Sequence, residues 1–134
     1  MGVLVDSNVI LDILEDNQEW ADWSEETLSM YSEDHILYIN PVIYTEISIG
    51  FNKIEELEEA ISLGGFKIIP IPREALFLAG KAFLQYRRRK GSKTSTLPDF
   101  YIGAHAAVTE LPVITRDTSR IQSYFPTVQV IAPA

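Results

Sequence analysis

Residues 2–14, which read GVLVDSNVILDIL, decide the fold. Val3, Leu4 and Val5 form a short apolar run with β-branched ends, which predicts a strand buried on both faces. Asp6 ends this run, and the Ser-Asn pair after it (two good N-cap types) leads into apolar residues typical of a helix. Asp6 is thereby placed at the carboxyl end of a strand, the edge where ligand sites form in open α/β sheets. The segment predicts an α/β fold with a charged group at that edge.

Length, composition and charge narrow the class of protein. The 134 residues suit one domain, 1–134, and without cysteine the chain has neither disulfides nor thiolate metal ligands. No apolar run approaches the roughly 18 residues of a membrane span, so we expect a soluble, cytoplasmic protein with no membrane partner. The net charge is −8, yet residues 1–66 carry −14 and residues 67–134 carry +6. The acidic average argues against nonspecific nucleic-acid binding, whereas the asymmetry leaves room for one basic surface.

Strand and helix patterns alternate along the rest of the chain. Strands are expected at residues 36–39, 66–71, 113–115 and 128–131, helices at 18–31, 41–49, 53–63, 73–90, 98–108 and 118–124, and a polar loop at 91–96. Asn40 and Pro41 have the residue types of an N-cap and a first helical position, and Gly64-Gly65 predicts a left-handed helix end. The alternation predicts a five-stranded, mostly parallel sheet with helices on both faces.

Four acids recur where such a fold places functional groups. Asp117 repeats the arrangement of Asp6, because it also follows a short buried strand. Glu46 lies among isoleucines in the middle of a helix, and Asp99 lies in a helix's first turn, where the macrodipole favours an anion. Gly103, one turn after Asp99, allows close approach to the backbone. Taken singly, each acid also has a structural explanation as an Asx-turn residue, a helix cap or a solvated side chain.

If the four acids converge, their charge calls for a cation. Crowded carboxylates repel one another, and some take up protons unless a cation compensates. Oxygen ligands without Cys or paired His favour Mg²⁺ or Mn²⁺ over zinc. Such an ion activates a water and stabilises the leaving oxygen in phosphodiester hydrolysis. The residues alone therefore support the hypothesis of a metal-dependent phosphodiesterase.

Four segments of the chain together resemble the PIN-domain ribonucleases, and specifically the VapC-type toxins of toxin–antitoxin pairs. These segments are VLVDSNVILDIL, INPVIYTEISIG, LPDFYIGAHA and VITRDTSRI, which follow the family's order over most of the chain. The resemblance implies a PIN-like domain with catalytic and metal-binding roles for Asp6, Glu46, Asp99 and Asp117. It implies supporting polar roles for Asn8 and Thr115. It further implies an RNA substrate, a cognate antitoxin protein and a homodimer.

A dense basic cluster precedes Asp99 in the sequence. It consists of Arg87, Arg88, Arg89, Lys90 and Lys93. The charge asymmetry and the position of this cluster favour contact with RNA phosphates. The alternative is a solvated helix end, where cations suit the negative end of the helix dipole.

The histidines and the aromatic residues of the acidic half have structural explanations. His105 lies about 240° from Asp99 around the predicted helix, so a packing or solvent-exposed role is expected rather than that of a general base. His35, at the entry to a strand, is likewise expected to be structural. Trp20, Trp23 and Tyr31 recur at helical spacing, which is typical of core. Their acidic helix would also suit a basic antitoxin tail.

Other classes fit less well. A phosphoacceptor domain would have its acceptor Asp after the third strand, where residues 70–72 read PIP. A haloacid-dehalogenase-type phosphatase would have Asp at the position of Asn8, and a dinucleotide-binding domain needs a Gly-rich first turn. The remaining rival is a catalytically silent PIN-like module that binds RNA or protein.

Overall fold

The structure, a computed structural model, describes residues 1–89 and 97–134. Its strands are β1 Gly2–Val5, β2 Ile36–Ile39, β3 Phe66–Ile68, β4 Val113–Ile114 and β5 Val130–Ile131. Its helices are α1 Ser7–Leu14, α2 Ala21–Ser32, α3 Pro41–Ser48, α4 Ile54–Leu63, α5 Arg73–Arg88, α6 Leu97–Thr109 and α7 Ser119–Tyr124. The strands form one sheet in the order β3-β2-β1-β4-β5, and every neighbouring pair is parallel. The predicted α/β class and five-stranded sheet are confirmed.

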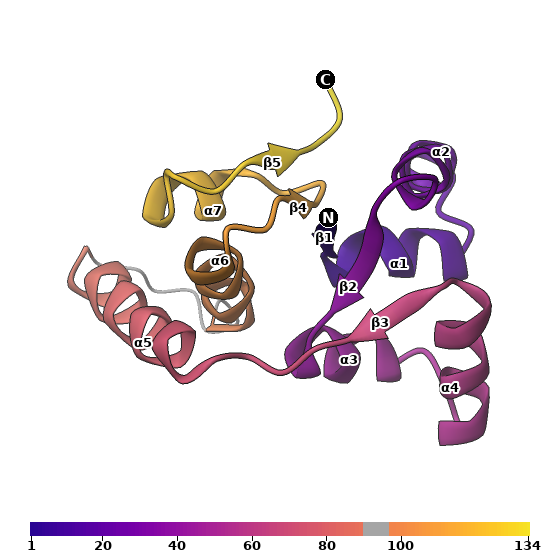
Figure 1. The fold of residues 1–134 in the computed structure, drawn as a ribbon, viewed down its shortest axis with the longest axis horizontal. Helices are drawn as coiled ribbons and strands as arrows, with labels where there is room; N and C mark the ends of the chain where they lie inside the picture. The colour runs from indigo at the N-terminus through magenta and orange to yellow at the C-terminus, as the bar shows by residue number, and fades with distance from the viewer. Residues whose placement is uncertain (90–96) are drawn as a thin grey trace.

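The strand order fixes the edge at which a site can form. From the central strand β1, the chain passes through α1 and α2 to β2 on one side, and it later reaches β4 on the other side through α5 and α6. In Figure 1, α1, α2 and α4 lie to the right of the strands, and α5 and α6 lie to their left. Ligands of open parallel sheets bind at the carboxyl ends of strands where the direction of the connections reverses. Here that place lies between β1 and β4.

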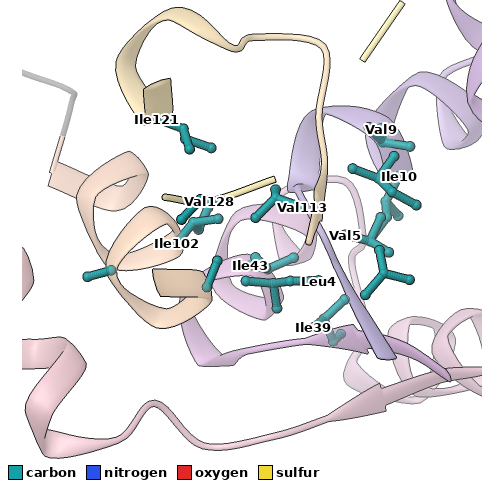
Figure 2. Packing of buried hydrophobic residues seen from close by; sticks show 14 of the residues in the cluster. Leu4, Val5, Val9, Ile10, Ile39, Ile43, Ile102, Val113, Ile121 and Val128 are labelled. Atoms are coloured by element: carbon teal, nitrogen blue, oxygen red, sulfur yellow. The ribbon is translucent and has the colours of Figure 1, made fainter. Parts of the chain in front are cut away.

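β1 is the centre of the core. Val3, Leu4 and Val5 have no exposed surface, because β1 has a strand on each side and helices over each face. Figure 2 shows Val5 beside Val9 and Ile10 of α1, with Leu4 on the other side of the strand. Burial on both faces explains why the run is apolar at every position rather than at alternate ones.

Several boundaries differ from the sequence patterns. β3 ends at Ile68 rather than at residue 71, because Pro70 and Pro72 have no backbone N–H for a strand ladder. β4 ends at Ile114, and β5 begins at Val130. The polar loop predicted at residues 91–96 lies outside the described residues. In the part of the chain that the structure describes, no helix has the length and apolar character needed to cross a bilayer.

Two helix boundaries follow the signals in the sequence. Asn40 caps α3, because its Oδ1 accepts a hydrogen bond from the backbone N of Ile43 at 2.9 Å, and Pro41 is the first helical residue. At the end of α4, Gly65 has a φ of +74°, a conformation that glycine adopts without steric cost. Both predicted caps are confirmed. The Asn40 cap sets the start of the helix that carries Glu46.

Aromatic packing anchors the start of α6, the helix that carries Asp99. Phe100 is fully buried, with its ring centroid 5.2–6.3 Å from four other rings. These rings belong to Phe83, Tyr86, Tyr124 and Phe125 of α5, α7 and the residue after α7. The first turn of α6 is therefore held on two sides.

The two glycines inside helices α5 and α6 should respond in opposite ways to Ala. A Cβ at Gly103 would lie 2.6 Å from Cε2 of the buried Phe125, whereas a Cβ at Gly80 would have no neighbour within 4 Å. We expect Gly103→Ala to lower the free energy of unfolding by about 1–3 kcal/mol through overpacking. Gly80→Ala should raise it by about 0.5–1 kcal/mol through helix propensity. Urea unfolding measures both, and equal effects at the two positions would contradict the packing described for α6.

Candidate active site

Asp6 and Thr115 meet at the carboxyl ends of the neighbouring strands β1 and β4. The pairing of Val5 with Ile114 places Asp6 beside Thr115, and the backbone N of Asp6 donates to the carbonyl of Ile114 at 2.9 Å. Thr115 Oγ1 donates to Asp6 Oδ2 at 2.7 Å. Asp6, rather than Ser7, is the N-cap residue of α1, but its side chain makes no capping hydrogen bond. Its carboxylate is instead directed to the neighbouring strand end.

Glu46 and Asp99 are brought to the same place from α3 and α6. Ser7 Oγ donates to Glu46 Oε1 at 2.8 Å and lies 3.4 Å from Asp6 Oδ1, so one hydroxyl lies between two carboxylates. The negative charges of Asp99 and Glu46 both act on Asp6, and the charge of Asp99 also acts on Glu46. Three of the four acids selected from the sequence are therefore neighbours.

The pKa values of Asp6 and Glu46 are both raised. Burial is the largest cause for Asp6, which is 6% exposed, and the charges of Asp99 and Glu46 add to it. Together these effects outweigh the hydrogen bond from Thr115 and raise the pKa of Asp6 from 3.8 to about 6. Burial, followed by the charge of Asp99, also raises the pKa of Glu46 against the effect of the Ser7 hydrogen bond. The ionised carboxylates at this site therefore lower the free energy of unfolding.

These residues fit a divalent cation chemically. The metal-binding atoms would be carboxylate oxygens. Burial and then the charges of Asp99 and Glu46 raise the pKa of Asp6, and a bound cation would offset both effects. Within residues 1–89 and 97–134, no three His, Asp or Glu side chains are already arranged to hold one ion together. Mg²⁺ is usually bound by one or two carboxylates and several waters, so a complete protein cage is not required.

The fourth acid, Asp117, lies at the outer side of this cluster. It is exposed, and its Oδ1 accepts a hydrogen bond from Ser119 Oγ at 3.1 Å. Its backbone N donates to Thr115 Oγ1 at 3.1 Å, and Asn8 Nδ2 donates to the same oxygen at 3.2 Å. Asn8 and Thr115, the two predicted supporting residues, therefore contact each other and connect Asp117 to Asp6.

The sequence that forms this parallel sheet matches a known family. The sequence model of the PIN domain matches residues 3–124. The chain belongs to the PIN domain family. The PIN family is a nuclease family, and membership supports hydrolysis of nucleic acid as the class of activity of this protein. No curated protein sequence matches the chain.

Solved structures with similar folds cover nearly the whole PIN domain. VapBC2 from Rickettsia felis, bound to a DNA fragment from its promoter, gives a TM-score of 0.73 at 16% identity, over 98% of each chain. VapBC-1 from nontypeable Haemophilus influenzae gives 0.73 at 16% identity, also over 98% of each chain. A toxin–antitoxin complex from Klebsiella pneumoniae gives 0.67 at 24% identity, over 99% of this chain and 98% of that chain. These likenesses support the fold.

His105 is a packing residue in this PIN domain. It is 1% exposed, and its Nδ1 lies 3.1 Å from Nδ2 of Asn40. Because Asn40 Oδ1 already accepts from Ile43, its Nδ2 must donate, so His105 Nδ1 accepts and the ring is neutral. The expectation that His105 packs rather than acts as a base agrees with this geometry. The pair joins α3 to α6, the two helices that carry Glu46 and Asp99.

Acidification should weaken the fold through His105. Burial lowers the pKa of His105 below 6.5, so its contribution to stability is present above pH 6.5 and lost as the pH falls through the folded value. The raised pKa of Asp6 acts in the opposite direction, so Asp6→Asn is the suitable background. Between pH 8 and 5, that variant should lose more unfolding free energy than Asp6→Asn combined with His105→Gln. Parallel pH curves would contradict the buried neutral imidazole.

The basic cluster lies partly within the described residues. Arg87 and Arg88 end α5, Arg89 follows them, and all three are exposed. The guanidinium carbon of Arg89 lies 5.3 Å from the ring centroid of Tyr124. Lys90 and Lys93 lie outside the described residues. Contact with RNA by this cluster stays a prediction.

Three residues near the site were not selected from the sequence. Ser7 holds Glu46, and Asp12 of α1 makes a two-pronged ion pair with Arg116, the residue after Thr115. One signal was available for Asp12, because an acid within the apolar run VILDIL has the same context as Glu46. Neither Ser7 nor Arg116 has a comparable signal.

Proposed function

We propose that this PIN domain is a metal-dependent endoribonuclease that hydrolyses RNA phosphodiester bonds, and that it is the toxin of a toxin–antitoxin pair. The observation that carries the proposal is the meeting of Asp6 and Glu46 across the Ser7 hydroxyl at the carboxyl end of β1, within reach of the charge of Asp99. Crowding of carboxylates costs stability, and a site that binds a cation offsets this cost in its loaded form. Membership in the PIN family supports nuclease activity.

The proposed cofactor is Mg²⁺ or Mn²⁺. When bound, such an ion supplies an activated water and compensates charge on the phosphate oxygens. Asp6 and Asp99 would be its principal ligands, and Asp117 would serve a second or weaker ion. Glu46 would be a ligand or the base that orients water, since its raised pKa brings it closer to the working pH. Ser7 Oγ donates to one carboxylate oxygen of Glu46 and so fixes its orientation.

The proposed substrate is RNA, guided by the basic cluster. Arg87, Arg88 and Arg89 belong to the half of the chain with a net charge of +6 and are exposed. Arginine contacts to phosphates would supply affinity without sequence preference. The site residues carry negative charge and repel the phosphate, and a cation held by Asp6 and Asp99 would offset that repulsion.

The proposed protein partner is a cognate antitoxin, and a homodimer is the proposed assembly. Similar folds occur in the toxin–antitoxin and VapBC structures named above. The acidic half also offers a surface for a basic, apolar segment. A hollow of 280 Å³ lies among α1, α2 and α4, with Leu14, Leu28 and Glu25 in its lining. Leu14 is 45% exposed there.

The test is cleavage of a panel of structured RNAs by the antitoxin-free protein with Mg²⁺, Mn²⁺ or EDTA. Cleavage that requires metal and disappears in the folded Asp6→Asn variant would support the proposal. Cleavage that survives in that variant would exclude the carboxylate site. If the protein cleaves no RNA and Mn²⁺ does not raise its melting temperature, the catalytically silent binding module becomes the better account.

A further inference from the structure

A partly buried ion pair, between Asp12 and Arg116, adjoins the site on the side of α1 and α2. Asp12 is 3% exposed, and its carboxylate accepts from Arg116 Nε at 2.6 Å and Nη2 at 2.9 Å. Ser24 Oγ of α2 donates to the same carboxylate at 3.1 Å. The guanidinium carbon lies 5.5 Å from the ring centroid of Trp20. Arg116 is thus fixed by a planar fork and by an aromatic ring, which lysine could not reproduce.

The face of α1 that carries Asp12 also contacts Thr115, the residue before Arg116. Asn8 and Asp12 are four residues apart and lie on one side of the helix. Asn8 Oδ1 accepts from the backbone N of Arg116 at 3.4 Å, and Asn8 Nδ2 donates to Thr115 Oγ1 at 3.2 Å. The segment between β4 and α7 is therefore attached to α1 by both its backbone and its side chains.

The Thr115 hydroxyl transmits this attachment to Asp6. A hydroxyl has one proton to donate, and the short 2.7 Å contact with Asp6 Oδ2 takes it. The lone pairs then accept from Asn8 Nδ2 and from the backbone N of Asp117. The orientation of one Asp6 oxygen and the course of the backbone at Asp117 depend on the same hydroxyl.

We propose that the Asp12–Arg116 ion pair positions Thr115 and Asp117 against Asp6, so that Arg116 is a positioning residue for the metal site. This inference rests on the proposed function, because it assigns the pair a role in a metal-binding nuclease. Because Arg116 is paired with Asp12, we expect it to affect the metal site indirectly, by holding the backbone of the segment between β4 and α7 in place. A pair that served the fold alone would leave the metal affinity unchanged when it is replaced.

The test is the Mn²⁺ dissociation constant of the full chain, measured from the EPR signal of free Mn²⁺, together with circular dichroism. The double variant Asp12→Asn, Arg116→Gln removes both charges and leaves no unpaired buried ion. We expect it to fold and to bind Mn²⁺ about 10–100-fold more weakly, the range typical for residues that orient metal ligands. Arg116→Lys keeps the charge without the fork, so its loss of affinity should exceed twofold and be smaller than that of the double variant.

Ser24→Ala is the matched control. It removes a partner of the same carboxylate but leaves the link between Asp12 and Arg116 intact, so the Mn²⁺ affinity should equal that of wild type. If the double variant does not fold, Arg116→Lys decides alone. Affinities within twofold of wild type in both Arg116 variants would overturn the positioning role and leave the nuclease proposal untouched. Absence of Mn²⁺ binding by the wild type would overturn both, and that result separates the two failures.

Discussion

We expect Asp6→Asn to abolish metal-dependent RNA cleavage and, at the same time, to make the metal-free protein more stable near neutral pH. The pKa of Asp6 is about 6, above its ordinary 3.8, so the folded protein holds this proton more tightly than the unfolded chain does. Its contribution to stability is present below pH 3.8 and is lost as the pH rises through 6. The shift corresponds to about 3 kcal/mol of unfolding free energy at pH 7.5, which an uncharged amide does not lose.

Urea unfolding in EDTA at pH 4 and pH 7.5 measures this effect. The free energy of unfolding of Asp6→Asn should exceed that of wild type at pH 7.5 and approach it at pH 4. Mn²⁺ should stabilise wild type and not the variant. Asp16→Asn is the control, because Asp16 is exposed with a φ of +50°, which Asn tolerates. An Asp6→Asn protein that is less stable than wild type at pH 7.5 would contradict the description of Asp6 as a buried carboxylate that Asp99 and Glu46 repel.

The second large effect is expected for Asp99→Asn. The variant should lose about 10³-fold or more in cleavage rate, because loss of a ligand removes several kcal/mol of charge stabilisation and each 1.4 kcal/mol is tenfold. It should also lower the pKa of Asp6 below about 6, since the charge of Asp99 contributes to raising it. Glu46→Gln should lower the same pKa by less, because its charge is the smaller contribution.

Carbon-13 NMR titration of the Asp6 carboxyl group in metal-free protein measures this pKa. Glu55→Gln serves as the control. Glu55 is an exposed acid in the first turn of α4, and its substitution changes the net charge by the same amount as Asp99→Asn. An Asp6 pKa that is equal in wild type and Asp99→Asn would show that the two carboxylates do not interact. Repulsion between these two carboxylates could then no longer be given as a reason for the site to bind a cation.

Much of this arrangement could be predicted because short buried strands are readable in a sequence. Val3–Val5 has no polar residue to expose, and Asp6 can then lie only at the strand's end. The sequence does not contain the strand order, however. The meeting of Asp6 with Thr115 depends on β4 pairing with β1, a contact between residues more than a hundred positions apart.

Contacts made by single polar side chains were less predictable. The bond between Ser7 and Glu46 depends on how α3 crosses α1, and the ion pair between Asp12 and Arg116 depends on the path of the chain after β4. Asp117 was grouped with Asp6 by its place after a strand, yet it is exposed and hydrogen-bonded to Ser119. Position along a strand predicts the edge of the sheet but not the direction of the side chain.

The most direct test of the central claim is the position of Mn²⁺ in a crystal of the metal-soaked protein, measured by anomalous diffraction at the manganese edge. The account predicts a peak within coordination distance of carboxylate oxygens of Asp6 and Asp99, near Glu46, and its loss in Asp6→Asn crystals. A peak confined to the exposed acids of α2 or α4, with none at the ends of β1 and β4, would contradict it.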